Sequence, residues 1–254
     1  MRKMSVSSLL AFICACQVLI GFASSFAPSP LLLLTSHRQS SLTTARFVQT
    51  SAADYESKIV AANDLLYKAA ETKAEDPDEV FEALSDLEKL MRKKSRDDPN
   101  AAQDVLDNLN GSWRLIFTTG TKKTQERVKG RINYFPLKAV QSFDTTTTPF
   151  SIENGIYIGE WSALRFNGSF EFNLKSRKLE FEFNKISIFG FTIDLGQGMD
   201  AKLGKTSGLG ADSNVELQKQ GKKAFFNWIS ADGKIATARG GGGGLALWKR
   251  VEQE

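Results

Sequence analysis

Cysteine and histidine are nearly absent from this chain of 254 residues. The cysteines are Cys14 and Cys16 and the single histidine is His37, so all of them lie before residue 54. The rest of the chain therefore excludes a disulfide framework, a zinc site of cysteine and histidine, a cysteine nucleophile and a Ser-His-Asp triad. Catalysis by a carboxylate, lysine or tyrosine stays possible, although histidine, the usual general base, is absent. We predict no catalytic residues, no metal site and no cofactor.

Acidic residues are missing from the first 53 positions, where the charged side chains are Arg2, Lys3, Arg38 and Arg46. Subtracting these 4 from the 33 Lys and Arg of the chain leaves 29, against 29 Asp and Glu, so the remainder carries no net charge. A domain that binds nucleic acid usually presents a basic surface. The charge balance therefore predicts no nucleic-acid partner.

The first 25 residues have the order of a secretory signal peptide. Arg2 and Lys3 precede an apolar run from Leu9 to Phe22, which ends in the small residues Ala23-Ser24-Ser25. Such a run is short for a membrane span, and small residues after it mark a cleavage site. We predict cleavage between Ser25 and Phe26.

The residues around this site resemble a plastid-targeting motif. Ala23-Ser24-Ser25-Phe26-Ala27-Pro28 is similar to the bipartite ASA-FAP motif of algae whose plastids lie inside extra membranes, such as diatoms. Residues 26–53 contain serine, threonine and arginine without an acidic residue, which is typical of a transit peptide. The resemblance implies that the chain reaches the plastid through the endoplasmic reticulum.

Residues 54–108 have the periodicity of helices. A first apolar stripe runs from Tyr55 to Ala69 at spacings of three and four, and a second runs from Val80 to Met91. Asp76-Pro77 and Asp98-Pro99 both have the composition of a helix start. These segments predict an N-terminal helical layer that packs by one side.

After Leu109 apolar and polar residues alternate, which is typical of strands. Residues 175–178 and Asp232-Gly233 are expected to form hairpin turns, and 196–213 a long loop. The expected strands are 113–117, 140–143, 150–158, 161–166, 170–174, 179–184, 186–195, 215–217, 224–229 and 245–249. Successive strands without helices between them predict a mainly β fold, an antiparallel barrel or sandwich, with 54–254 as one folded unit.

Aromatic residues are concentrated in this second part. All 4 tryptophans and 13 of the 18 phenylalanines follow Leu109, several of them at alternating strand positions. One face of the sheet is therefore lined with bulky rings. In a barrel of about eight strands that face either fills the interior or surrounds one small ligand.

Gly111-Ser112-Trp113 resembles the first signature of lipocalins, in which the tryptophan closes the barrel floor beneath a late arginine. The resemblance implies that Trp113 and Arg239 form a barrel-closing pair. A cation over an indole ring contributes about 0.5–2 kcal/mol.

A longer resemblance covers roughly residues 55–250. Leu109 to Thr119 is similar to the "LnGxWxLlYTS" opening of the plastid lipid-associated proteins, or fibrillins, and Leu87-Glu88 to the "LE" position of the preceding helix. Ile229 to Lys249 is similar to the end of that family, where Asp232 and Arg239-Gly240 take the Asp and R-G positions. The family implies a lipocalin-like antiparallel β-barrel over 109–254.

The resemblance also implies a function. The chain is expected to be a non-enzymatic plastid protein that binds or organises isoprenoids, carotenoids, quinones or acyl lipids at thylakoids or plastoglobules. Its expected partners are a hydrophobic small molecule or lipid and the surface of a plastid membrane or lipid globule. With Trp113 pointing inward, strand alternation gives as ligand-binding residues Leu115, Phe117, Leu164, Phe166, Phe170, Phe172, Phe181, Phe183 and Trp228.

Two other functions stay open at this point. One is a structural coat or scaffold of plastid lipid bodies, with a barrel filled by its own rings. The other is a lipocalin-type enzyme acting on lipid or carotenoid, which needs paired carboxylates inside the barrel, with Asp194 and Asp200 as the nearest candidates.

Overall fold

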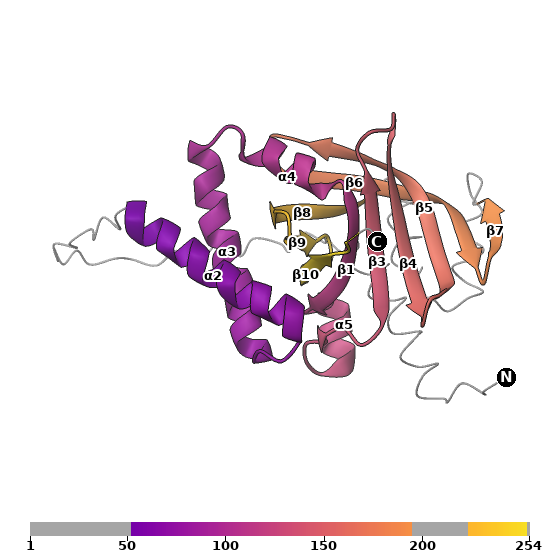
Figure 1. Ribbon diagram of the computed structural model, residues 1–254, viewed down its shortest axis with the longest axis horizontal. Coiled ribbons are helices and arrows are strands. Elements are labelled where there is room, and N and C mark those ends of the chain that lie inside the picture. The colour runs from indigo at the N-terminus through magenta and orange to yellow at the C-terminus, as the bar shows by residue number, and fades with distance from the viewer. Residues whose placement is uncertain (1–51, 195–222, 253–254) are drawn as a thin grey trace, which may run out of the picture.

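Three helices precede the sheet in the computed structural model, which describes residues 52–194 and 223–252 (Figure 1). The predicted signal peptide with its Ser25–Phe26 cleavage site and the transit peptide lie outside these ranges, apart from the last residues of the transit peptide. The expected loop over 196–213, the strand over 215–217 and Asp200 also lie outside them.

The helices are α2 (Ala52–Thr72), α3 (Pro77–Asp97) and α4 (Ala101–Leu109). The predicted start of α3 is confirmed, because the Asp76 side chain accepts hydrogen bonds from the backbone N–H groups of Asp78 and Glu79. Asp98 caps the end of α3, so α4 begins later than Asp98-Pro99 indicated. No helix in the described ranges is long and apolar enough to cross a membrane.

The strands agree with most of the expected segments, although 161–166 and 170–174 form one long strand. The expected strand 186–195 is divided by a turn at 189–190, so that its first part continues the strand from 179–184 and 191–194 pair back on it. A short helix, α5, and strand β9 were not predicted, because neither has a clear apolar period. The elements after α4 are β1 (Gly111–Thr118), α5 (Lys122–Val128), β2 (Asn133–Tyr134), β3 (Lys138–Asp144), β4 (Phe150–Ile158), β5 (Trp161–Asn173), β6 (Lys178–Ile188), β7 (Phe191–Asp194), β8 (Ala224–Ala231), β9 (Ile235–Gly240) and β10 (Leu245–Arg250).

The sheet closes on itself. Its order is β10-β9-β8-β6-β5-β4-β3-β1, and β1 also pairs with β10, so eight antiparallel strands of the described chain form a ring. The short strands β2 and β7 lie beside this ring, on β1 and β6. The predicted mainly β fold, a lipocalin-like antiparallel barrel after a helical segment, is confirmed.

The wall of β1, β8, β9 and β10 is apolar on both faces. Its inner face contributes Trp113, Trp228 and Trp248 to the core inside the barrel. Its outer face contributes Ile116 and Phe117 to a second core beneath α2 and α3. Figure 1 shows these two helices on the side of the barrel where β10 and β1 lie. Burial on both sides explains why these strands have nearly continuous apolar runs.

Two β-bulges supply the change of face. The pairing of β1 with β10 shifts between Leu115 and Phe117, and that of β8 with β9 shifts between Trp228 and Ser230. Each extra residue, Ile116 and Ile229, enters the core beneath the helices. A bulge interrupts the alternation of side chains, so one strand can serve both cores.

Polar contacts also fasten the helical layer to the barrel. Glu88 of α3 accepts hydrogen bonds from Arg239 of β9 at 2.8 and 2.6 Å, and Arg239 also donates to the carbonyl oxygen of Gly243 at 2.6 Å. The Tyr67 hydroxyl of α2 donates to Asp232 at 2.8 Å; burial, followed by this hydrogen bond, raises the pKa of Tyr67 to about 12. Glu88 and Arg239, which lie in two separate sequence motifs, thus meet in space.

Replacing Glu88 should loosen the helical layer. Glu88→Ala removes both acceptors of a partly buried, bidentate arginine pair, so we expect the free energy of unfolding to fall by about 1–3 kcal/mol. Urea denaturation measures the change. Glu82→Ala on the exposed face of the same helix is the matched control and should change stability little. Equal stability of the two variants would contradict this role of Glu88.

Candidate ligand site in the barrel

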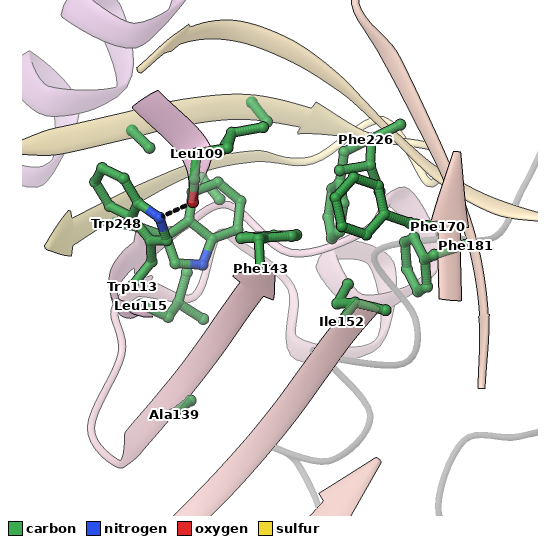
Figure 2. Close-up of a cluster of buried hydrophobic side chains, with 14 of the residues drawn as sticks. Leu109, Trp113, Leu115, Ala139, Phe143, Ile152, Phe170, Phe181, Phe226 and Trp248 are labelled. Atoms are coloured by element: carbon green, nitrogen blue, oxygen red, sulfur yellow. Dashed lines mark hydrogen bonds between the residues drawn. The ribbon is translucent and has the colours of Figure 1, made fainter. Parts of the chain in front are cut away.

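The interior of the barrel is lined by apolar side chains from all eight ring strands and from α4, whose Val105 and Leu109 belong to the same core. α4 therefore covers one end of the barrel, which we call the closed end. Figure 2 shows Phe143 between Trp113 and Trp248 on one side and Phe170, Phe181 and Phe226 on the other. The opposite end, where β4 meets β5 and β6 meets β7, is called the mouth.

Aromatic rings form a continuous series along this interior. Trp248 contacts Trp228 and Phe226 with centroids 5.4 and 5.9 Å apart, and Phe226 stacks on Phe181 at 5.3 Å. Phe181 contacts Phe183 at 5.2 Å, and Phe183 contacts Phe166 at 5.4 Å. Nearer the mouth the lining includes the aliphatic side chains of Ile156, Leu164 and Ile186, together with the buried ring of Phe135, which precedes β3.

Eight of the nine residues expected to face the interior contribute to this core. Leu115, Leu164, Phe166, Phe170, Phe181 and Trp228 are buried in it, and Phe172 and Phe183 are partly buried against it. The expectation for Phe117 is wrong: its side chain lies in the core beneath the helices, because the bulge at Ile116 reverses the alternation.

The partner of Trp113 also differs from the expected one. The Trp113 indole N–H donates to the carbonyl oxygen of Leu109, the last residue of α4, at 2.8 Å (Figure 2). The guanidinium above its ring is that of Arg250, 4.2 Å from the centroid, and it also donates to Asn110. The Trp113–Arg239 pairing is thus wrong, because Arg239 lies on the outer face and binds Glu88. Burial lowers the pKa of Arg250, which as an arginine stays charged.

Two amide side chains lie inside the barrel, which the sequence analysis did not identify. Gln141 follows Ala139 and precedes Phe143 on the inward face of β3, and Asn154 lies opposite it on β4. Both residues are only 1% exposed. The oxygens Gln141 Oε1 and Asn154 Oδ1 have no hydrogen-bond partner among the described residues, and nor does Trp228 Nε1. A polar residue at an inward position of an alternating strand is the signal that marks them.

The mouth is edged by exposed apolar side chains. Trp161 and Phe191 are each 80% exposed and Phe189 is 61% exposed, with Ile158 and Ile193 beside them. They flank the turn between β4 and β5 and the turn between β6 and β7. These five residues are called the rim.

Asp194, one of the two carboxylates considered for an enzyme, is exposed and lies 3.9 Å from Lys185, outside the interior. No group of three or more His, Cys, Asp or Glu residues that could hold a metal ion occurs in the described ranges. A hollow of about 460 Å³ on the outer face includes Ser142, Glu153 and Asn167 in its lining, and its polar character does not suit a hydrophobic ligand.

The sequence model of the PAP_fibrillin family matches residues 56–247, which include the helical layer and all eight ring strands as far as Leu247 of β10. A search of curated proteins finds no match to the chain.

Trp113 should be among the most important residues for stability. Trp113→Ala removes a fully buried ring that fastens α4 to the barrel, so we expect the free energy of unfolding to fall by about 3–5 kcal/mol. Arg250→Met keeps the stem over the ring and removes the cation, with an expected loss of about 0.5–2 kcal/mol. Chemical denaturation measures both changes. A loss below about 1 kcal/mol for Trp113→Ala would refute its place at the closed end.

Proposed function

The chain belongs to the PAP/fibrillin family of plastid lipid-associated proteins, and we propose that it binds one hydrophobic molecule inside its barrel. The observation that carries the proposal is the continuity of the apolar interior with the exposed apolar rim. α4 covers the other end, so we propose that a molecule enters at the rim. The ligand classes are those named above: isoprenoids, carotenoids, quinones and acyl lipids.

The physical basis of binding is burial of hydrocarbon. Each Å² of apolar surface removed from water contributes about 25 cal/mol, so a long chain gains affinity along its whole length. The mouth half of the barrel suits such a chain, because Ile156, Leu164 and Ile186 are aliphatic and Phe166 and Phe183 offer ring faces. Selectivity then depends on the length and the end group of the ligand.

We propose further that the protein acts at the surface of a thylakoid or plastoglobule and reaches the plastid through the endoplasmic reticulum. The presequence motif Ser25-Phe26-Ala27-Pro28 supports this route. Residues 54–254 are proposed to fold as one unit, since Glu88–Arg239 and Tyr67–Asp232 join the helical layer to the barrel. The protein is proposed to be non-enzymatic, which agrees with the exposure of Asp194.

A structural coat of lipid bodies is the second candidate function. Contact between the rings of Trp228, Trp248, Phe226 and Phe181 favours it, because these side chains fill the closed half of the barrel themselves. The two functions differ in what the protein carries. A binder holds one molecule in the mouth half, whereas a coat associates only with bulk lipid.

Lipid extraction separates the two functions. The chain with an affinity tag after Glu254 is purified from plastid-containing cells, extracted with solvent and analysed by mass spectrometry. The proposal predicts one dominant prenyl or acyl species in a near-stoichiometric amount. A clean extract, or a mixture that matches the bulk membrane lipid, would favour the coat. The same sample gives the mature N-terminus, which is expected at Phe26 or later.

A further inference from the structure

We propose that Gln141 and Asn154 form a recognition site for a hydroxyl group at the end of a long hydrophobic molecule. This inference rests on the proposed function of the barrel as a ligand site. It goes further by naming the residues that select the ligand and the end group that they select.

The two amides form a pair at half depth. Gln141 and Asn154 are directly opposite each other on the antiparallel strands β3 and β4. On the mouth side the next inward pair is Ala139 and Ile156, and on the closed side it is Phe143 and Ile152. Phe166 of β5 pairs with Asn154 across the next strand. The two amides are thus a pair of polar side chains between apolar inward-facing pairs of β3 and β4.

Burying two amide groups inside the barrel costs free energy unless each forms a hydrogen bond with a partner. A buried amide oxygen without a hydrogen bond is unfavourable, and leucine in its place would avoid that penalty. Both oxygens are acceptors, so the missing partner is a donor. A hydroxyl group both donates and accepts, so it can pair with the oxygen or with the nitrogen of either amide.

The third unpaired group extends this pattern. The Trp228 ring contacts Phe143, the inward neighbour of Gln141, with centroids 5.6 Å apart, and its indole N–H is a donor without a partner in the described ranges. β8 lies across the ring from β3, so this donor and the two acceptors face the interior from opposite walls, and together they match the two capacities of a hydroxyl oxygen. A purely hydrocarbon ligand would leave all of them unpaired.

The test uses retinol and retinyl methyl ether, which share the retinyl chain; in the ether a methyl group replaces the hydroxyl hydrogen, so the donor is lost. The buried tryptophans transfer energy to either probe, so loss of their emission reports binding. Tagged protein purified from cells is used after lipid removal. We expect retinol to bind about tenfold more tightly than the ether, the value of roughly one hydrogen bond. In Gln141→Leu/Asn154→Leu this preference should disappear.

The control measurements distinguish failure of the amide site from failure of the proposed ligand function. Ser142→Ala, on the outward face of the same strand, should keep the preference, and thermal unfolding should show that the leucine variant is folded. Equal affinity of the unchanged protein for both probes, or a preference that survives in the leucine variant, would overturn the amide site while leaving the ligand function intact. Failure of both probes to bind would count against the ligand function itself.

The rim carries a second inference, independent of the interior: we infer that it inserts into an uncharged lipid surface. The turns between β4 and β5 and between β6 and β7 lie side by side, because the backbone N–H of Phe189 donates to Ala163 at 3.1 Å. A Cβ added at Gly159 or Gly190 would meet no atom within 4 Å, so both turns project into open space. Figure 1 shows β7 and the β4–β5 turn on the side away from α2 and α3.

The types of the rim residues and the charges around them indicate which kind of surface the rim contacts. Tryptophan and phenylalanine on projecting turns are typical of side chains that lie at a membrane interface. The charged groups beside the rim are paired within the protein, Lys138 with Glu160 at 3.0 Å and Lys185 with Asp194 at 3.9 Å. Among the described residues the rim therefore has no excess charge to attract anionic headgroups, and an uncharged or zwitterionic surface is its complement.

Flotation with phosphatidylcholine vesicles tests the rim. We expect the unchanged protein to float with the vesicles, and Trp161→Ser/Phe189→Ser/Phe191→Ser to bind on the order of tenfold less, because three exposed rings no longer leave water. Leu174→Ser, an exposed apolar residue in the turn at the other end of β5, is the matched control and should bind normally. Added salt should have little effect.

Trp161 also reports its own insertion. The difference between the emission of the unchanged protein and that of Trp161→Ser isolates this residue, since the other tryptophans are buried. Its emission should shift to the blue when vesicles are added. An unshifted Trp161, normal flotation of the triple variant, or binding that requires phosphatidylglycerol would overturn the inference. So would self-association through the rim without any binding to vesicles.

Discussion

Burial of the wall of β1, β8, β9 and β10 on both of its faces is the constraint on which the rest of the molecule depends. The inner face closes the barrel with three tryptophans, and the outer face holds α2 and α3 with Ile116, Phe117, Leu245 and Leu247. Because the helices cover this wall, the remaining strands can keep polar outer faces. The packing that stabilises the fold is thereby concentrated at one side and at the closed end of the barrel. The rim residues at the mouth are exposed and contribute little to this packing.

This division suits a protein that handles lipid. Trp113, its contact with Leu109 and the rings around it fill the closed half, where tight packing gives a defined structure. The mouth half has aliphatic residues, a pair of buried amides and a rim that a soluble domain would usually avoid. Gln141, Asn154 and the rim are unfavourable for the stability of the free protein. We propose that the two amides bind the ligand and that the rim binds the lipid surface.

Much of this fold could be predicted from the sequence, because alternation in β5 and β6 and the cap at Asp76 are local signals. The bulges could not be, since an extra residue in one strand is visible only against its partner, and this is why Phe117 was assigned to the wrong face. The sequence analysis named only Arg239 as the partner of Trp113, because the register of β10, which places Arg250 opposite Trp113, depends on long-range strand pairing. Gln141 and Asn154 had a local signal, but their pairing depends on how β3 and β4 align.

The most direct test of the central claim is a crystal structure of the protein purified from plastid-containing cells without removal of lipid. The account predicts elongated electron density in the mouth half, running from Gln141 and Asn154 toward Trp161. A structure in which Phe166, Phe183 and Ile186 close over that space, with no density between them, would contradict a ligand-binding barrel.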